Sequence, residues 1–337
     1  MRRLLFILGP LLLFLSGCAA ARPDGGAAFA PAEEERLVIY TSHREAVYAP
    51  IIKEFEDRTG IWVQMETGGT GELLDRIAAE AEAPVCDLLF GGGADSLQSR
   101  AELFEPYVSP LAEEVQPAFR CPDGSWTAFS SLPVVLIYNP MLVRTNPPEG
   151  WESLLDPVWR GRIAFAHPAV SGGSYTALAT MLQALPGDGV LEAFYRSLDG
   201  QTLSGITAVV DEVADAVAEG SCTVGITVEP AALEAIEAGR NVALLYPREG
   251  TSAAPDGMAV VSGCAHGENA RRFIDFALGG DVQRYLARSC RRRSVRKDLF
   301  AQEPETDGMV LIDYDLERAA AEREWVLSVW QSWEGVS

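Results

Sequence analysis

Positive charge is scarce in this sequence. Its 337 residues include 27 Lys and Arg but 48 Asp and Glu, which gives a formal net charge of −21 at pH 7. Nucleic-acid binding depends on clustered cations that neutralise phosphates, so the composition argues against nucleic acid as a partner. The overall balance does not fix the sign of the charge inside any one pocket. The length allows two domains or lobes, each with its own core.

The signatures of common enzymes and metal sites are missing as well. There is no GxSxG elbow, no HExxH and no phosphate-binding loop with its lysine. A catalytic triad need not be sequential, so an enzyme stays open as a second class of function, but nothing here predicts one. The cysteines show no CxxC and no Cys/His spacing typical of structural zinc. We therefore expect a protein without catalytic residues, resident metal or cofactor.

Cysteine itself is rare, and the first of the six belongs to an export signal. A short basic start precedes an apolar run, residues 4–15, which is too short to span a membrane. Leu15-Ser16-Gly17-Cys18 then resembles the lipobox of bacterial lipoproteins, in which the cysteine becomes the lipid-bearing first residue. We expect a signal peptide over residues 1–17, lipidation at Cys18 and a flexible tether over 18–35. The alternative is an ordinary cleaved signal.

Export would place the other five cysteines where disulfides persist. Five is an odd number, so at least one has no partner within the chain. The pairs we expect are Cys264–Cys290 and Cys86–Cys121, which would leave Cys222 as a small buried residue. The alternative is that all five are free thiols in the core.

The first third of the folded part has a βαβαβ pattern. Apolar runs at 37–40, 61–65 and 85–90 predict strands, and helical spacing at 47–58 and 71–80 predicts the helices between them. Each strand ends in polar or glycine-rich residues, above all the turn at 66–72. In open α/β sheets ligands bind outside the carboxyl ends of the strands, so these turns are expected to form one wall of a binding site.

A second α/β unit follows the first. A long apolar strand at 130–139 is expected to cross between the units, and a strand at 163–165 leads into a second Gly/Ser turn at 171–174 before a helix. Another strand, 258–261, is expected to return to the first unit. The predicted division is residues 36–130 with 248–293 for lobe 1, and residues 131–247 with 294–337 for lobe 2.

Several phrases resemble the periplasmic solute-binding proteins of ABC importers. They include LVIYTSHREAVY at 37–48, WRGRIAF at 159–165, PDGMAV at 255–260 and RRSVR at 292–296. The branch that they resemble most binds ferric ion, thiamine, phosphonates and sugar phosphates. The resemblance implies a two-lobe class II fold with crossing hinge strands, and a monomer that works with a permease and an ATPase. It also implies a periplasmic or cell-surface protein, held to the membrane here only through the lipid.

The ferric-ion pattern of that branch is incomplete in this chain. Ferric binders typically use a His after the first strand, an acid after the third and two adjacent Tyr in the second lobe. His43 matches the first position, but the acid position falls in Gly91-Gly92-Gly93, and no Tyr-Tyr occurs anywhere. A hard trivalent ion needs anionic oxygen ligands. Ferric ion is therefore the alternative to a phosphorus-bearing solute as the ligand. As a class of function, the alternative to a transport protein is a sensor input domain.

Hydroxyl groups and backbone amides remain as the predicted ligand donors, many at helix starts that favour negative charge. They suit a small solute that carries a phosphate or phosphonate group. Tyr175 could stack on the organic part, and Glu229 could accept an amine. Each residue has an alternative role as a cap or turn former. The candidate ligand-binding residues are Ser42, His43, Thr67, Gly69, Thr70, Gly92, Ser131, Ser171, Gly172, Ser174, Tyr175, Thr207 and Glu229.

Overall fold

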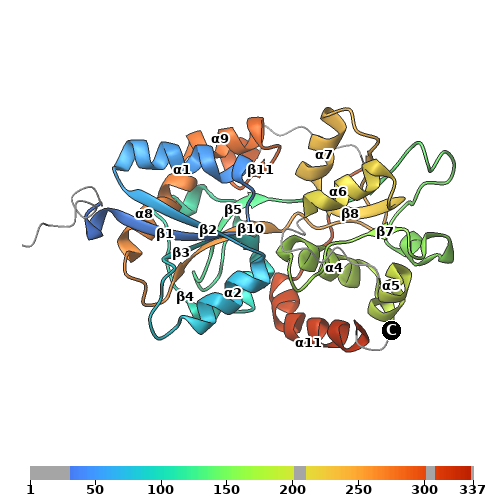
Figure 1. The fold of residues 1–337 in the computed structure, drawn as a ribbon, viewed down its shortest axis with the longest axis horizontal. Coiled ribbons are helices and arrows are strands. Elements are labelled where there is room, and N and C mark those ends of the chain that lie inside the picture. Colours follow the sequence, from blue (N-terminus) through green and yellow to red (C-terminus); the bar gives the residue numbers. More distant parts are fainter. Residues whose placement is uncertain (1–30, 201–209, 301–307, 335–337) are drawn as a thin grey trace, which may run out of the picture.

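The structure is a computed structural model that describes residues 31–200, 210–300 and 308–334. The predicted signal peptide, the lipidation site Cys18 and the candidate Thr207 lie outside the described residues. The chain forms two α/β lobes that lie side by side, each with its own sheet and core (Figure 1). The predicted α/β two-lobe class II fold is confirmed.

The first lobe is built on a seven-stranded sheet. The strand order is β11-β5-β10-β3-β1-β2, and β4 also pairs with β10. The strands are β1 (Arg36–Thr41), β2 (Trp62–Thr67), β3 (Leu88–Gly93), β4 (Phe104–Glu105), β5 (Thr127–Ser131), β10 (Pro255–Val261) and β11 (Arg293–Ser294). The helices are α1 (Glu45–Thr59), α2 (Thr70–Ala79), α3 (Ala94–Gln98), α8 (Gly267–Ala277), α9 (Gly280–Ser289) and α10 (Lys297–Phe300).

The second lobe has a smaller, four-stranded sheet with the order β7-β8-β6-β9. The strands are β6 (Val134–Tyr138), β7 (Ile163–Ala164), β8 (Val224–Val228) and β9 (Ala243–Leu245). The helices are α4 (Gly172–Ala184), α5 (Val190–Leu198), α6 (Val210–Glu219), α7 (Glu229–Glu237) and α11 (Leu316–Glu334). The helix α11 packs Val326 and Trp330 into the core of this lobe and also contacts α3 of the first.

In the first lobe β1 and β3 are largely buried, whereas β2 lies at the edge of the sheet and is partly exposed. In β1, β2 and β3 the parallel pairing and the apolar side chains follow the βαβαβ pattern of the sequence. The apolar face of α1 packs Phe55 edge-on against Phe273 of α8, with ring centroids 5.1 Å apart. The helix ends at Gly60, whose φ of 73° is the left-handed conformation that glycine adopts without strain. This arrangement sets the carboxyl ends of the three parallel strands toward the second lobe.

Two adjacent segments carry the chain between the lobes. Residues 132–134 lead from β5 to β6, and residues 251–255 lead back from the second sheet to β10. The two are hydrogen-bonded to each other, from the Leu132 N–H to the Ala254 carbonyl (3.2 Å) and from the Val134 N–H to the Ser252 carbonyl (3.1 Å). The boundary predicted between residues 293 and 294 falls inside strand β11, which pairs with β5 of the first sheet.

The predicted disulfides are wrong, because all five described cysteines are free: Cys86, Cys121, Cys222, Cys264 and Cys290. Each sulfur has surroundings of its own. The buried Cys86 thiol donates to the Leu88 carbonyl at 3.3 Å, and Cys121 contacts Asp123 at 3.0 Å. Burial raises the pKa of the Cys264 thiol to about 11.

The described helices include none that is both long and apolar enough to cross a membrane.

Candidate functional site

A cavity of about 100 Å³ lies between the lobes, at the carboxyl ends of the strands. The first lobe contributes the loops after β1 and β2, the end of β3 and the start of β10. The second lobe contributes the loop before α4 and the start of α7. Seven candidate residues from the sequence line this cavity: Ser42, His43, Gly69, Thr70, Gly92, Ser171 and Gly172.

Four helices of at least nine residues begin at the cavity wall. Their N-cap residues, which all line the cavity, are Arg44 for α1, Gly69 for α2, Ser171 for α4 and Val228 for α7. The first N–H groups of a helix have no partner within the helix, and its dipole gives that end partial positive charge. Ser171 satisfies one of these donors, because its hydroxyl accepts from the Ser174 N–H. Convergence of four helix N-termini from both lobes makes the cavity attractive to an anion.

The floor of the cavity holds a buried ion pair that the sequence analysis missed. Arg292 donates through Nη1 to Asp256 Oδ2 at 2.6 Å and to the Ser130 hydroxyl at 2.9 Å. The other Asp256 oxygen accepts from the Ser130 N–H (2.8 Å) and hydroxyl (2.7 Å). Burial raises the pKa of Asp256, and the positive charge of Arg292 opposes that shift. The carboxylate is thus fully engaged, while the guanidinium still lines the cavity.

His43 is enclosed beside this pair. Its ring lies against Phe90 and Phe129, at centroid distances of 4.6 and 5.3 Å. Arg292 Nη2 lies 3.4 Å from Nδ1 and Asp256 Oδ2 lies 3.5 Å from Nε2. Burial, followed by the charge of Arg292, holds the pKa of His43 well below its usual value. The imidazole is therefore neutral at neutral pH.

His43 should make the fold sensitive to acid. The unfolded chain would take up a proton at His43 below its ordinary pKa of 6.5, whereas the folded chain would not. Stability is then present at neutral pH and lost as the pH falls below that value, by up to about 2 kcal/mol from about pH 7 to about pH 5. We expect His43→Gln to lose correspondingly less stability over this interval. Urea unfolding of both proteins at the two pH values measures the difference, and equal losses would contradict it.

Glycines let the lobes approach closely beside the cavity. A Cβ on Gly69 would lie 2.8 Å from the Val170 carbonyl oxygen, and one on Gly172 would lie 2.9 Å from the Gly93 nitrogen. Both contacts join one lobe to the other, and real Cβ atoms are essentially never that close to another heavy atom. The N–H of Gly71 donates to the Val170 carbonyl at 3.4 Å. The glycine-rich turns thus serve lobe contact as well as the cavity wall.

A buried carboxylate also joins the lobes behind these glycines. Asp95 of α3 accepts from the Thr176 hydroxyl of α4 at 2.8 Å and from the Tyr314 hydroxyl at 2.6 Å. Burial raises the pKa of Asp95, and these two hydrogen bonds oppose the shift. Thr176 lines the cavity, and no sequence motif had marked it.

Five candidates from the sequence do not line the cavity. Thr67 is exposed, and the Ser131 hydroxyl donates to the Ala253 carbonyl at 2.8 Å. Ser174 is buried in α4 and is not among the residues that line the cavity. Tyr175 cannot stack on a solute, since it is 1% exposed and donates its hydroxyl to the Ala319 carbonyl of α11. Glu229 forms an ion pair with Arg293 at 2.7 Å.

No cluster of three or more His, Cys, Asp or Glu side chains within the described ranges could hold a metal ion. His43 and Asp256 are the metal-ligating types that line the cavity, and the aspartate is committed to Arg292. The donor set at this site is therefore poor in the anionic oxygens that a hard cation requires.

A family model and two known proteins are similar to this chain over most of its length. The family model described as "Bacterial extracellular solute-binding protein" matches residues 83–317. The chain is 28% identical over 292 residues to iron uptake protein A1 of Synechocystis sp., which covers 82% of this chain and 79% of that protein. It is 24% identical over 298 residues to a putative 2-aminoethylphosphonate-binding periplasmic protein of Salmonella typhimurium, covering 84% and 81%.

A solved structure shares the whole architecture. The periplasmic binding protein AfuA from Actinobacillus pleuropneumoniae, with fructose-6-phosphate bound, superposes with a TM-score of 0.79. The two sequences are 26% identical, and the match covers 90% of this chain and 99% of that one. Proteins similar to this chain thus carry names that refer to iron, a phosphonate and a sugar phosphate.

Proposed function

The chain belongs to the bacterial extracellular solute-binding proteins, which supply ABC importers with solute, and from this premise we propose that its own solute is a small anion bearing a phosphate or phosphonate group. The solute is captured between the lobes and passed to the permease and ATPase. We also propose that Cys18 carries a lipid and that the protein acts as a monomer.

The four helix N-termini around the cavity carry this proposal. They supply positive potential and N–H donors from both lobes, and Arg292 adds a cation at the floor. The lining carboxylate, Asp256, is neutralised by the same arginine. A tetrahedral oxyanion fits such a site because its oxygens accept from several directions at once.

The size of the cavity favours a small solute. At about 100 Å³ it is well below the ~300–1,000 Å³ of sites that take drug-sized ligands. A phosphate or an aminoalkylphosphonate suits this volume, whereas a hexose phosphate would require the lobes to move apart. The order of affinity expected is therefore small phosphonate or phosphate first and sugar phosphate second.

Ferric ion is the second candidate, because relatives 28% identical to this chain are named for iron. The absence of a metal-binding cluster among the described residues speaks against it. Titration calorimetry on the folded protein with inorganic phosphate, 2-aminoethylphosphonate, fructose 6-phosphate and ferric citrate separates the candidates. We expect stoichiometric binding of an organic or inorganic phosphorus anion. Ferric uptake with none of the three anions bound would overturn the proposal.

A further inference from the structure

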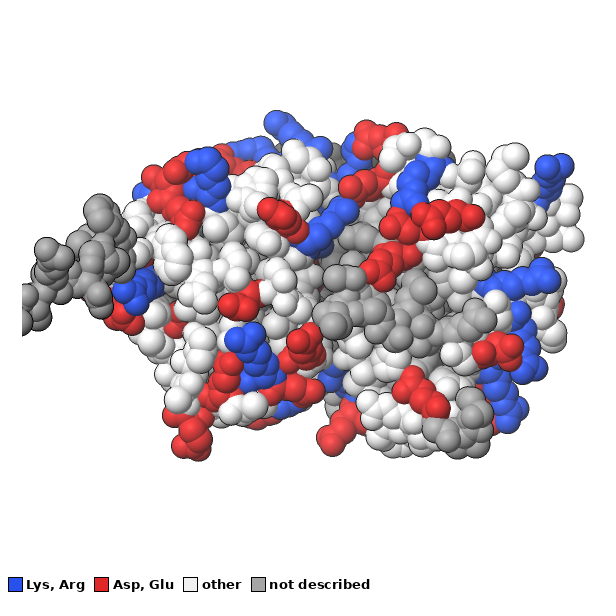
Figure 2. Space-filling view, viewed as in Figure 1, with Lys and Arg blue, Asp and Glu red and all other residues white. Residues whose placement is uncertain are grey.

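A second contact between the lobes lies on the side of α7, away from the glycine turns. There each of three arginines of the first lobe meets a glutamate of α7, and basic and acidic side chains adjoin along the upper part of the junction (Figure 2). We propose that these ion pairs form a latch that holds the lobes together and limits how fast a solute leaves. The arginine–glutamate latch consists of Arg44–Glu234, Arg291–Glu237 and Arg293–Glu229.

The inner pair of the latch is the most enclosed. Arg293 donates from Nε to Glu229 Oε2 at 2.7 Å and from Nη2 to Oε1 at 2.9 Å, which is the parallel, bidentate geometry. The side chains are 14% and 4% exposed. Tyr246 also donates its hydroxyl to Glu229. Separation of the lobes would remove Arg293 from Glu229 and leave the carboxylate with Tyr246 alone, so this pair opposes opening.

The two outer pairs of the latch, Arg44–Glu234 and Arg291–Glu237, are more exposed, so dissolved salt weakens them. Glu234 and Glu237 lie three residues apart, so they share one face of α7 and both reach across to the first lobe. Their side chains are 51% and 63% exposed. Exposed pairs of this kind contribute modestly and are screened by ions. The latch thus combines one salt-resistant pair with two that weaken as ionic strength rises.

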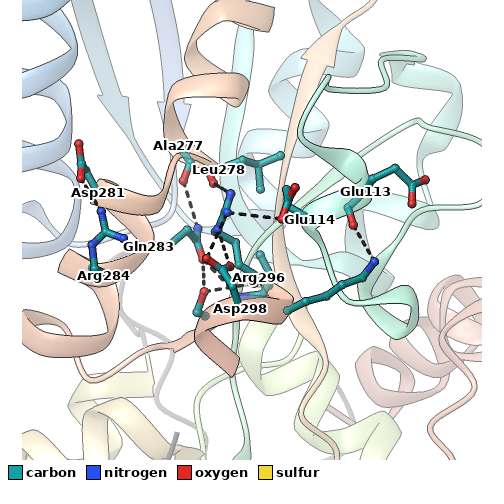
Figure 3. A network of polar contacts seen from close by, with 12 residues as sticks. Glu113, Glu114, Ala277, Leu278, Asp281, Gln283, Arg284, Arg296 and Asp298 are labelled. Carbon is teal, nitrogen blue, oxygen red and sulfur yellow. Dashed lines mark hydrogen bonds and ion pairs between the residues drawn. The ribbon is translucent and has the colours of Figure 1, made fainter. Parts of the chain in front are cut away.

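The segment that carries two of the three latch arginines is held to the first lobe by a network of polar contacts (Figure 3). Gln283 of α9 donates to the Phe129 and Ala277 carbonyls and accepts from the Ser294 hydroxyl at 2.8 Å and the Val295 N–H at 3.2 Å. Arg296 adds a hydrogen bond to the Leu278 carbonyl at 3.2 Å. These contacts fix the segment that follows α9 to the first lobe, so Arg291 and Arg293 move with that lobe as one unit.

The same segment links the latch to the cavity. Arg291 and Arg293 pair with glutamates of α7, while Arg292 between them lines the cavity. Closure of the lobes therefore engages the latch and completes the cavity in a single movement.

The double variant Glu234→Gln with Glu237→Gln tests the latch without requiring a known solute. We expect a larger radius of gyration than for the natural chain in small-angle X-ray scattering at about 0.05 M salt. The natural chain should shift in the same direction at about 0.5 M salt, and the variant should shift less. For whichever anion of the calorimetric panel binds, the dissociation rate should rise about 2- to 25-fold.

A matched control is Glu192→Gln with Glu149→Gln, which removes two exposed glutamates whose partners, Arg196 and Arg248, lie in the same lobe. It should scatter like the natural chain. A second variant, Glu229→Gln, should have a larger radius of gyration than the double variant Glu234→Gln with Glu237→Gln. Lowering the salt concentration should not restore the radius of the natural chain. Equal radii for the latch variants and the control at both salt concentrations would overturn the latch, and this result would leave the nature of the solute undecided.

Discussion

A Gly71→Ala variant is expected to bind its solute about ten- to a hundredfold more weakly without unfolding more easily. A Cβ at this position would overlap the Ala169 carbonyl oxygen of the other lobe. That atom belongs to the backbone and cannot swing aside, so the lobes must stay apart. Overpacking of this kind costs about 1–3 kcal/mol. Since the clash exists only when the lobes meet, the cost falls on closure rather than on folding.

The stability of the first lobe should stay the same or rise. Gly71 lies in α2, and alanine favours a helix over glycine by up to about 1 kcal/mol. Gly267→Ala in α8 is the matched control, because its Cβ would make only ordinary contacts, with the Cys264 sulfur at 3.4 Å and with Arg271 Nη2 at 3.9 Å. Calorimetry gives the affinity and thermal unfolding gives the stability of each variant. Unchanged affinity in Gly71→Ala would show that the described lobe contact plays no part in capture.

The fold was predictable because its main signals are local. Apolar runs of four to six residues alternating with helical spacing identified β1, α1, β2 and α2 nearly in place. The third strand was placed at 85–90, but it lies at Leu88–Gly93. Glycine is unfavourable in strands, so the sequence predicts that the strand ends at the three glycines. They are needed inside it, because Gly91 and Gly92 have φ of 112° and 94°, and a Cβ on Gly91 would lie 2.7 Å from the Ser42 hydroxyl.

Of the residues that line the cavity, the sequence predicted mainly those in turns between a strand and a helix. Gly69, Thr70, Ser171 and Gly172 were found because a turn between a strand and a helix has a recognisable composition. Tyr175 was misplaced, because the turn motif does not reveal which face of α4 lies beneath α11. The arginine run at 291–293 stands out in the sequence, but its composition does not show that Arg292 lines the cavity. What each of its members contacts depends on pairing between segments far apart in the chain, and no local pattern encodes it.

The ion pair at the cavity floor is where stability and binding can be separated. Arg292→Gln should leave Asp256 buried without its counter-ion, which costs about 3–5 kcal/mol of unfolding free energy. Removing the arginine also removes a cause that lowers the pKa of Asp256, so this pKa should rise further. A raised carboxyl pKa means that the folded state holds the proton more tightly. Part of the lost stability should therefore return as the pH falls toward about pH 5 and be lost again as it rises.

A double-mutant cycle with Asp256→Asn completes the test. Residues in direct contact couple by about 0.5–3 kcal/mol, so the double variant should be more stable than the sum of the single effects predicts. Its anion affinity should nevertheless stay as low as that of Arg292→Gln, because both proteins lack the cation that faces the cavity. Urea unfolding measures the first quantity and calorimetry with the bound phosphorus anion the second. Additive stabilities would contradict the ion pair, whereas recovery of affinity in the double variant would show that Arg292 supports the fold but does not hold the solute.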